Sequence, residues 1–341
     1  MGTPQKGLVL ITGADTFIGA HAALAFLNRG FLVRGTVQNM DCPSVHGLRA
    51  ALETQGYEGR FELIEVPSIK MFGALHQAVV GKHHASAEPG LFPIVSADEA
   101  HVAANAARDT IVHVIESVRK EPGIKSFVLL SNVEAVASNN NLKPNRTYTE
   151  KDWNETRLPK NLPLAIHEMF SILTPRTEKA FWRSARGEGI PDPGFTMTAI
   201  CSGICVGPPV SLPFLPHAAC MKSLRKSAVE SIWDIYNGKE IEAAGASEYQ
   251  AFVDVRDLAS LMVGCIVHPS EADQQRVIAA STYTRLQDVA ELLRSAWPER
   301  AGLIKTGAPY TGYQPPSAFP GHMPFSGVQA AMLRPGRSYC L

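Results

Sequence analysis

The sequence predicts an α/β protein with a doubly wound parallel sheet and a smaller C-terminal lobe. Two observations lead to this fold class. Short apolar runs alternate with segments of helical periodicity through residues 1–207, which is typical of parallel strands joined by helices. After residue 207 the alternation stops, and amphipathic helices between irregular stretches predict a lobe that covers the ends of the strands.

The first unit of the sheet is the clearest. Residues 8–12 (LVLIT) are an apolar run that ends at Gly13, which is typical of a buried parallel strand. Residues 18–30 have helical periodicity and stop at a glycine, and residues 31–37 form the next apolar run. A strand–turn–helix–strand unit of about 30 residues is the opening of a dinucleotide-binding, or Rossmann, fold.

The remaining elements follow the same reasoning. A helix is predicted at 101–120, and strands are predicted at 61–66, 127–131 and 195–207. We take 1–207 as the Rossmann-like domain, with a long polar loop at 139–163. Residues 208–302 are mainly the smaller C-terminal lobe, with a strand near 277–280 that returns to the sheet.

Three further segments complete the C-terminal half. Helices are predicted at 253–267, with Asp254 as the N-terminal cap, and at 284–299. Residues 303–341 contain many prolines and little periodicity, so we expect an irregular tail.

The composition limits the function. Apolar residues make up 45% and charged residues 19% of 341 residues, and the formal net charge is zero. Neither nucleic acid nor an anionic membrane is favoured as a partner, so we expect a small-molecule substrate and a cytoplasmic monomer or homodimer. The six cysteines show no metal-like CxxC pairing, and no metal site is expected.

The first loop departs from the dinucleotide-binding pattern at one position. A full fingerprint has glycine at 13, 16 and 19, for the turn, the approach of the pyrophosphate and the packing of the helix. This chain keeps Gly13 and Gly19 but has Thr16, a branched residue, where the phosphate approaches.

Six short motifs occur in a characteristic order between residues 7 and 300. They are TGADTFIGAH, RGTVQ, TEKDWN, EKAFW, VGPP and FVDVRDLA. Together they resemble the extended short-chain dehydrogenase/reductases, in particular the dihydroflavonol reductase and fungal aldehyde/ketone reductase branch. The resemblance implies a Rossmann domain that binds NADP(H) and a C-terminal substrate lobe.

The resemblance also implies where the cofactor contacts were. They fall on the loop residues Gly13, Thr16, Phe17, Ile18 and Gly19. The arginine that pairs the 2′-phosphate is replaced by the uncharged Gln38, and Arg34 is a less direct substitute. The adenine-contacting aspartate is Ser68. We therefore expect that NADP(H) binding is weak or lost and that no cofactor is required.

The catalytic positions have changed too. The family's serine falls at Asn132 or Val133, its tyrosine at Phe170 and its lysine at Thr174. Phenylalanine cannot donate a proton and threonine carries no charge. Because Pro175 lacks an N–H, we expect the helix to kink or restart at Thr174. His167, three residues before Phe170, is the candidate replacement acid or base.

Three functions are compatible with these changes. The first is a cofactor-independent isomerisation, dehydration or cyclisation of a small organic, secondary-metabolite substrate by a repurposed enzyme. The second is an NADP(H)-dependent aldehyde or ketone reductase with a substitute acid. The third is a non-catalytic binding or sensor protein, as in the NmrA-like regulators.

Overall fold

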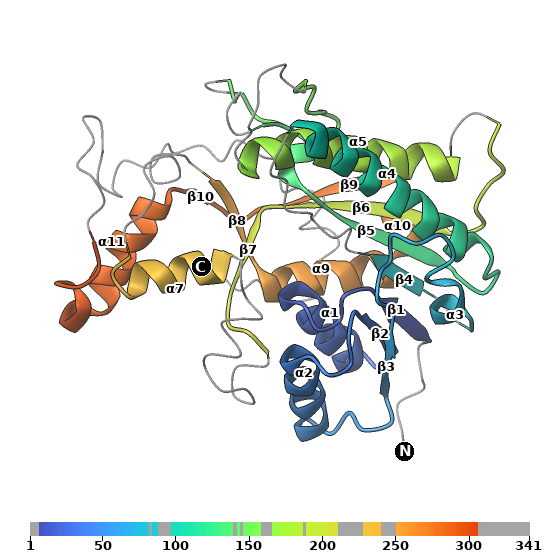
Figure 1. The fold of residues 1–341 in the computed structure, drawn as a ribbon, viewed down its shortest axis with the longest axis horizontal. Helices are drawn as coiled ribbons and strands as arrows, with labels where there is room; N and C mark the ends of the chain where they lie inside the picture. Colours follow the sequence, from blue (N-terminus) through green and yellow to red (C-terminus); the bar gives the residue numbers. More distant parts are fainter. Residues whose placement is uncertain are drawn as a thin grey trace.

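The computed structural model describes residues 7–81, 84–87, 97–138, 142–143, 146–157, 166–186, 189–210, 228–239 and 250–305. In these residues a seven-stranded parallel sheet lies between two layers of helices, and a three-stranded sheet begins the second lobe (Figure 1). The predicted doubly wound α/β fold is confirmed.

The larger sheet has the strand order β3-β2-β1-β4-β5-β6-β9. Its strands are β1 (Leu8–Ile11), β2 (Leu32–Val37), β3 (Phe61–Glu65), β4 (His84–Ala87), β5 (Ser126–Asn132), β6 (Thr196–Ser202) and β9 (Gln275–Ala279). All five predicted strands of the first half are present, and the predicted returning strand near 277–280 is β9, which pairs in parallel with β6.

The four helices predicted at 18–30, 101–120, 253–267 and 284–299 are present, with further helices between them. The helices are α1 (Phe17–Asn28), α2 (Pro43–Thr54), α3 (His76–Val79), α4 (Ala97–Arg119), α5 (Ile166–Arg186), α7 (Ala228–Tyr236), α9 (Val255–Val267), α10 (Pro269–Ala272) and α11 (Leu286–Ala296), with the 3₁₀ turns η1 (Val133–Ala135) and η4 (Pro298–Arg300). Asp254 caps α9, as predicted, because its side chain accepts a hydrogen bond from the backbone N–H of Arg256.

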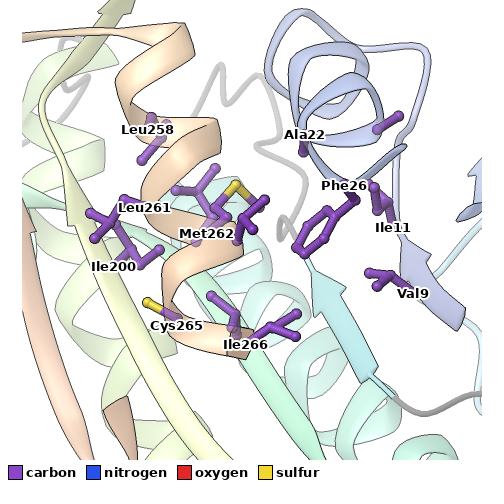
Figure 2. Close-up of a cluster of buried hydrophobic side chains, with 14 of the residues drawn as sticks. Val9, Ile11, Ala22, Phe26, Ile200, Leu258, Leu261, Met262, Cys265 and Ile266 are labelled. Atoms are coloured by element: carbon purple, nitrogen blue, oxygen red, sulfur yellow. The ribbon is translucent and has the colours of Figure 1, made fainter. Parts of the chain in front are cut away.

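Alternate residues of the strands face two separate cores. Val9 and Ile11 point to the side covered by α1 and α9, where Phe26 and Met262 meet (Figure 2). Leu10 belongs to the other core, under α3, α4 and α5. This alternation follows from the pleat of a strand, and burial on both faces is why β1 is apolar along its whole length.

The predicted strand 195–207 is in fact two strands in two sheets. The main sheet ends with β6 at Ser202, and β7 (Ile204–Val206) joins the smaller sheet with β8 (Gln250–Asp254) and β10 (Thr282–Thr284). Gly203 marks the change, because a Cβ there would lie 2.6 Å from the carbonyl oxygen of Ala251. The close approach of another backbone therefore divides one apolar run.

The predicted loop and tail are only partly described. Parts of 139–163 and all residues after 305 lie outside the described residues, so the prediction of an irregular tail is not tested beyond that point. Ile304 is buried against Ile235 and Ala290, so the second lobe still includes the first residues of the segment assigned to the tail.

Candidate functional site

The candidate site lies at the carboxyl ends of β1, β2, β4 and β5. The strand order reverses between β1 and β4, since β2 and β3 lie on one side of β1 and the later strands lie on the other. Open parallel sheets bind their ligands at such a reversal, outside the carboxyl ends of the strands.

The turn after β1 is built for a close approach of α1. Gly13 has φ +62°, a conformation that favours glycine. A Cβ on Gly19 would lie only 2.0 Å from the carbonyl oxygen of Gly13, so no other residue fits at the start of this helix without moving the turn. Of the first residues of α1, Ile18 packs against the first core, and the Phe17 and His21 rings make an edge-to-face contact. The turn thus brings the amino end of α1 to the edge of the sheet, where its first N–H groups have no acceptor within the helix.

Thr16 caps α1 with its side chain. Its hydroxyl donates to the carbonyl oxygen of Gly13 (2.8 Å) and accepts from the N–H of Gly19 (3.1 Å). The side chain is therefore folded back into the turn. One of the first-turn N–H groups is already satisfied by this cap and is not available to a phosphate while the cap is intact.

The end of β2 does not offer a free arginine. Gln38 is exposed. Arg34 pairs with Glu62 on β3 and donates to the carbonyl oxygens of Ala78 (2.9 Å) and Val80 (3.1 Å). These contacts tie β2 to β3 and to the end of α3, so Arg34 stabilises the sheet edge. Its role as a less direct substitute for the phosphate-binding arginine stays a prediction.

Ser68 makes a local contact only. Its hydroxyl accepts from the N–H of Lys70 at 3.4 Å, and the residue is half-buried in the loop that follows β3. Its expected place beside an adenine ring stays a prediction.

Asn132 is the polar residue at the serine position. It ends β5, and its side chain accepts from the N–H of Glu134, which starts η1. Val133 is 3% exposed and packs in a core cluster. Of the two residues that the sequence left as alternatives, only Asn132 has a side chain capable of hydrogen bonding.

Of the expected kink or restart of α5 at Thr174, the restart is wrong, and the kink stays a prediction. The helix runs from Ile166 to Arg186 with Pro175 inside it. Pro175 cannot donate to the carbonyl oxygen of Ser171, but Nδ2 of Asn154 donates to that oxygen at 2.8 Å. The external donor replaces the missing helical hydrogen bond, which explains why the helix continues.

The positions of the family's tyrosine and lysine, and the candidate acid, lie along this helix. His167 and Phe170 are in its first two turns, although their side chains lie outside the described residues. Thr174 is half-buried one turn later. The helix therefore places the three positions in one row, at the spacing of successive turns.

One turn beyond Thr174, a buried polar network joins α5 to the sheet. The carboxylate of Glu178 accepts from Arg276 on β9 (2.6 Å), from the Ser131 hydroxyl (2.7 Å) and from Cys201 on β6 (3.5 Å). Burial raises the pKa of the Cys201 thiol well above its usual value, and the neighbouring Glu178 raises it further. Cys201 is consequently a protonated structural thiol, not a nucleophile.

A second polar group connects α1 to the second lobe. Nε2 of His21 lies 2.8 Å from the carbonyl oxygen of Pro208, next to Asp254 and Arg256. Burial lowers the pKa of His21, an effect that the hydrogen bond to Pro208 partly offsets. For Asp254, burial alone would raise the pKa, but the hydrogen bonds and charge of Arg256 outweigh it and leave the pKa below its usual value.

Sequence reasoning missed Asn154, Glu178 and Arg276. The signal for Asn154 was Pro175, because a proline inside a helix always leaves one carbonyl group in need of a donor. Glu178 stands within EKAFW, but its partners are distant in the sequence. Among the residues that the structure describes, no cluster of three or more His, Cys, Asp or Glu side chains could hold a metal ion, and no helix could span a membrane.

Comparisons with known proteins agree with this architecture. No protein-family model matches the chain. The NAD-dependent epimerase/dehydratase terH of Aspergillus terreus is 26% identical over 314 residues, which cover 87% of this chain and 85% of that protein. Aldehyde reductase 2 of Sporidiobolus salmonicolor is 25% identical over 308 residues, which cover 87% and 83%. The names of these relatives agree with the predicted resemblance to the extended short-chain dehydrogenase/reductases.

Solved structures share the fold. Gre2 from Candida albicans superposes with a TM-score of 0.80 at 19% identity, over 98% of this chain and 95% of that one. Its NADPH complex superposes with a TM-score of 0.79 over the same shares.

The expectation that no cofactor is required, with NADP(H) binding weak or lost, is contradicted by these findings. A neighbour with the same fold is an NADPH complex, and the relatives are named as a reductase and an NAD-dependent epimerase/dehydratase. The expectation gave too much importance to the side chains at 16, 38 and 174. In this fold the phosphates are held mainly by the backbone turn and the amino end of the first helix, and both are present here. The comparisons favour the reductase alternative over a cofactor-independent reaction.

Proposed function

We propose that this protein binds a nicotinamide dinucleotide and reduces the carbonyl group of a small organic molecule, using an acid other than tyrosine. The observation that carries the proposal is the turn at Gly13 and Gly19, which sets the amino end of α1 at the reversal of strand order. The relatives support it, since they are named as reductases and as an epimerase/dehydratase.

The residues that would hold the dinucleotide follow from the fold. The backbone from Gly13 to Gly19 would bind the pyrophosphate, and the end of β2 with Gln38 would lie next to the adenosine ribose. When bound, the cofactor would supply a hydride for the carbonyl carbon. The protein then has to orient the carbonyl group and deliver a proton to its oxygen.

His167 is our candidate for the proton. It lies on α5 one turn before Phe170, and an imidazolium can donate a proton near neutral pH. Asn132, at the end of β5, would position the carbonyl oxygen by donating from its side-chain amide. Since Oδ1 of Asn132 accepts the capping hydrogen bond of η1, its NH₂ group is the part of the side chain that would donate to the substrate.

The test combines binding and turnover. NADH and NADPH are titrated by calorimetry, and oxidation of each is followed by absorbance with a panel of aldehydes and ketones. We expect His167→Ala to lower kcat by about 10²–10⁴-fold with little change in dinucleotide affinity. His46→Ala, at an exposed position on α2, is the matched control.

Two results would count against the proposal. Failure of both dinucleotides to bind would remove its basis. Binding without turnover of any carbonyl compound would instead favour a sensor protein.

A further inference from the structure

The further inference concerns Asn154, in the segment between β5 and α5. Pro175 removes the N–H that would normally donate to the carbonyl oxygen of Ser171. Ser171 is 3% exposed, so water does not reach this oxygen readily. A buried carbonyl group without a donor is unfavourable, and α5 would be expected to break here.

Asn154 provides the donor from outside the helix. Its Nδ2 donates to the carbonyl oxygen of Ser171 (2.8 Å) and lies 3.0 Å from the Ser171 hydroxyl. The same amide donates to the carbonyl oxygen of Glu134 in η1 (2.7 Å). One NH₂ group thus joins the helix to the turn.

Asn154 is itself firmly held. Its backbone N–H donates to the carbonyl oxygen of Ala135 (3.0 Å), and its Oδ1 accepts from the N–H of Thr156 (2.9 Å). The residue is 6% exposed. The second contact also fixes which way the amide points, because Oδ1 has to face an N–H and Nδ2 has to face the two carbonyl oxygens.

We infer that Asn154 is a positioning residue for the active site, and that it acts by replacing the hydrogen bond that Pro175 removes. Ser171 follows Phe170 directly and is one turn after His167 on α5. Glu134 is two residues after Asn132. The amide therefore sets the distance between the part of α5 that carries the candidate acid and the turn that carries Asn132.

Asparagine is required for this role, and the reason is chemical. An aspartate of the same shape has no N–H and would bring a negative charge against two carbonyl oxygens. Alanine would leave both carbonyl groups without this donor. Restoring a backbone N–H at position 175 should make one of the two contacts unnecessary, and this gives the inference a specific test.

The test compares wild type, Asn154→Ala, Pro175→Ala and the double variant. Hydrogen exchange is measured on peptides that cover 166–178, together with urea unfolding. In Pro175→Ala the new amide should be protected, because it donates to Ser171. Asn154→Ala alone should speed exchange in this half of α5 by about tenfold or more, as expected when a buried hydrogen bond is lost. In the Pro175→Ala background the same substitution should have a clearly smaller effect.

The catalytic part of the inference rests on the proposed function and has its own readout. Asn154→Ala should lower kcat at saturating substrate while leaving the dinucleotide Kd unchanged, and Pro175→Ala should partly restore kcat in the double variant. Asn154→Asp should not be better than Asn154→Ala.

The outcomes separate the two proposals. Equal effects of Asn154→Ala in both backgrounds would overturn the inference, because Asn154 would then only anchor η1. Absence of turnover in the wild type would count against the proposed function, while the exchange and unfolding measurements would still decide whether Asn154 substitutes for the missing N–H.

Discussion

Replacing Thr16 by glycine should strengthen dinucleotide binding. The Thr16 hydroxyl accepts from the N–H of Gly19 at 3.1 Å, so that N–H is not free to meet a phosphate. A hydrogen bond to a charged group contributes about 1.5–3 kcal/mol, and each 1.4 kcal/mol is tenfold in affinity. We expect Thr16→Gly to lower the Kd by about 10–100-fold. The loss of the cap should cost the fold only a few tenths of a kcal/mol, since glycine is itself tolerated at this position.

Calorimetry with NADH and NADPH would measure the change, and two further variants identify its cause. Thr16→Ser keeps the hydroxyl and removes only the methyl group, so its affinity should match the wild type if capping is responsible. Thr16→Ala frees the N–H but loses the cap, and should lower the stability by about 1 kcal/mol. The reasoning would be refuted if Thr16→Gly bound no more tightly than the wild type, or if Thr16→Ser alone gave the full gain.

Three other predictions concern stability, its dependence on pH, and dinucleotide binding. Arg276→Met should destabilise the protein by about 3–5 kcal/mol in urea unfolding, because it leaves the fully buried carboxylate of Glu178 without its cation; a loss below about 1 kcal/mol would contradict this. The pKa of His21 is lowered by burial from 6.5, so the unfolded chain takes up a proton first as the pH falls below that value. Stability should therefore decline below pH 6.5 more steeply in the wild type than in His21→Gln, and parallel curves would show that another group is responsible. Gly19→Ala should prevent dinucleotide binding, because the added Cβ would lie 2.0 Å from a carbonyl oxygen, whereas Gly302→Ala, where no atom lies within 4 Å, should behave as the wild type.

Six of the seven strands of the larger sheet could be predicted, and β4 (His84–Ala87), which is polar, was not. The clearest predictions were central strands that are buried on both faces. Such strands are continuous apolar runs, and 8–12 and 127–131 needed no further information. The rule that one apolar run forms one strand failed at Gly203. The apolar run 195–207 continues there, although the chain passes from the larger sheet to the smaller one. The division is caused by the close approach of the Ala251 backbone to Gly203, and Ala251 is distant in the sequence.

The location of the candidate site could be predicted from the sequence, but the side-chain contacts of its residues could not. Gly13 and Gly19 indicated the turn correctly. The cap formed by Thr16 and the ion pair of Arg34 depend on side-chain directions that no pattern gives. At Pro175 the local rule predicted a kink or a restart, but the partner at Asn154 is 21 residues away in the sequence, and its hydrogen bond lets the helix continue.

The late position of β9 and α9 in the chain has a consequence for synthesis on the ribosome. Residues 255–267 cover the core that α1 begins (Figure 2). Residues 275–279 add the last strand to the sheet. A nascent chain that ends near residue 207 would expose one side of its sheet and an open strand edge. The first domain therefore cannot finish folding before the second lobe has been translated, and fragments that stop between the two should depend on chaperones or aggregate.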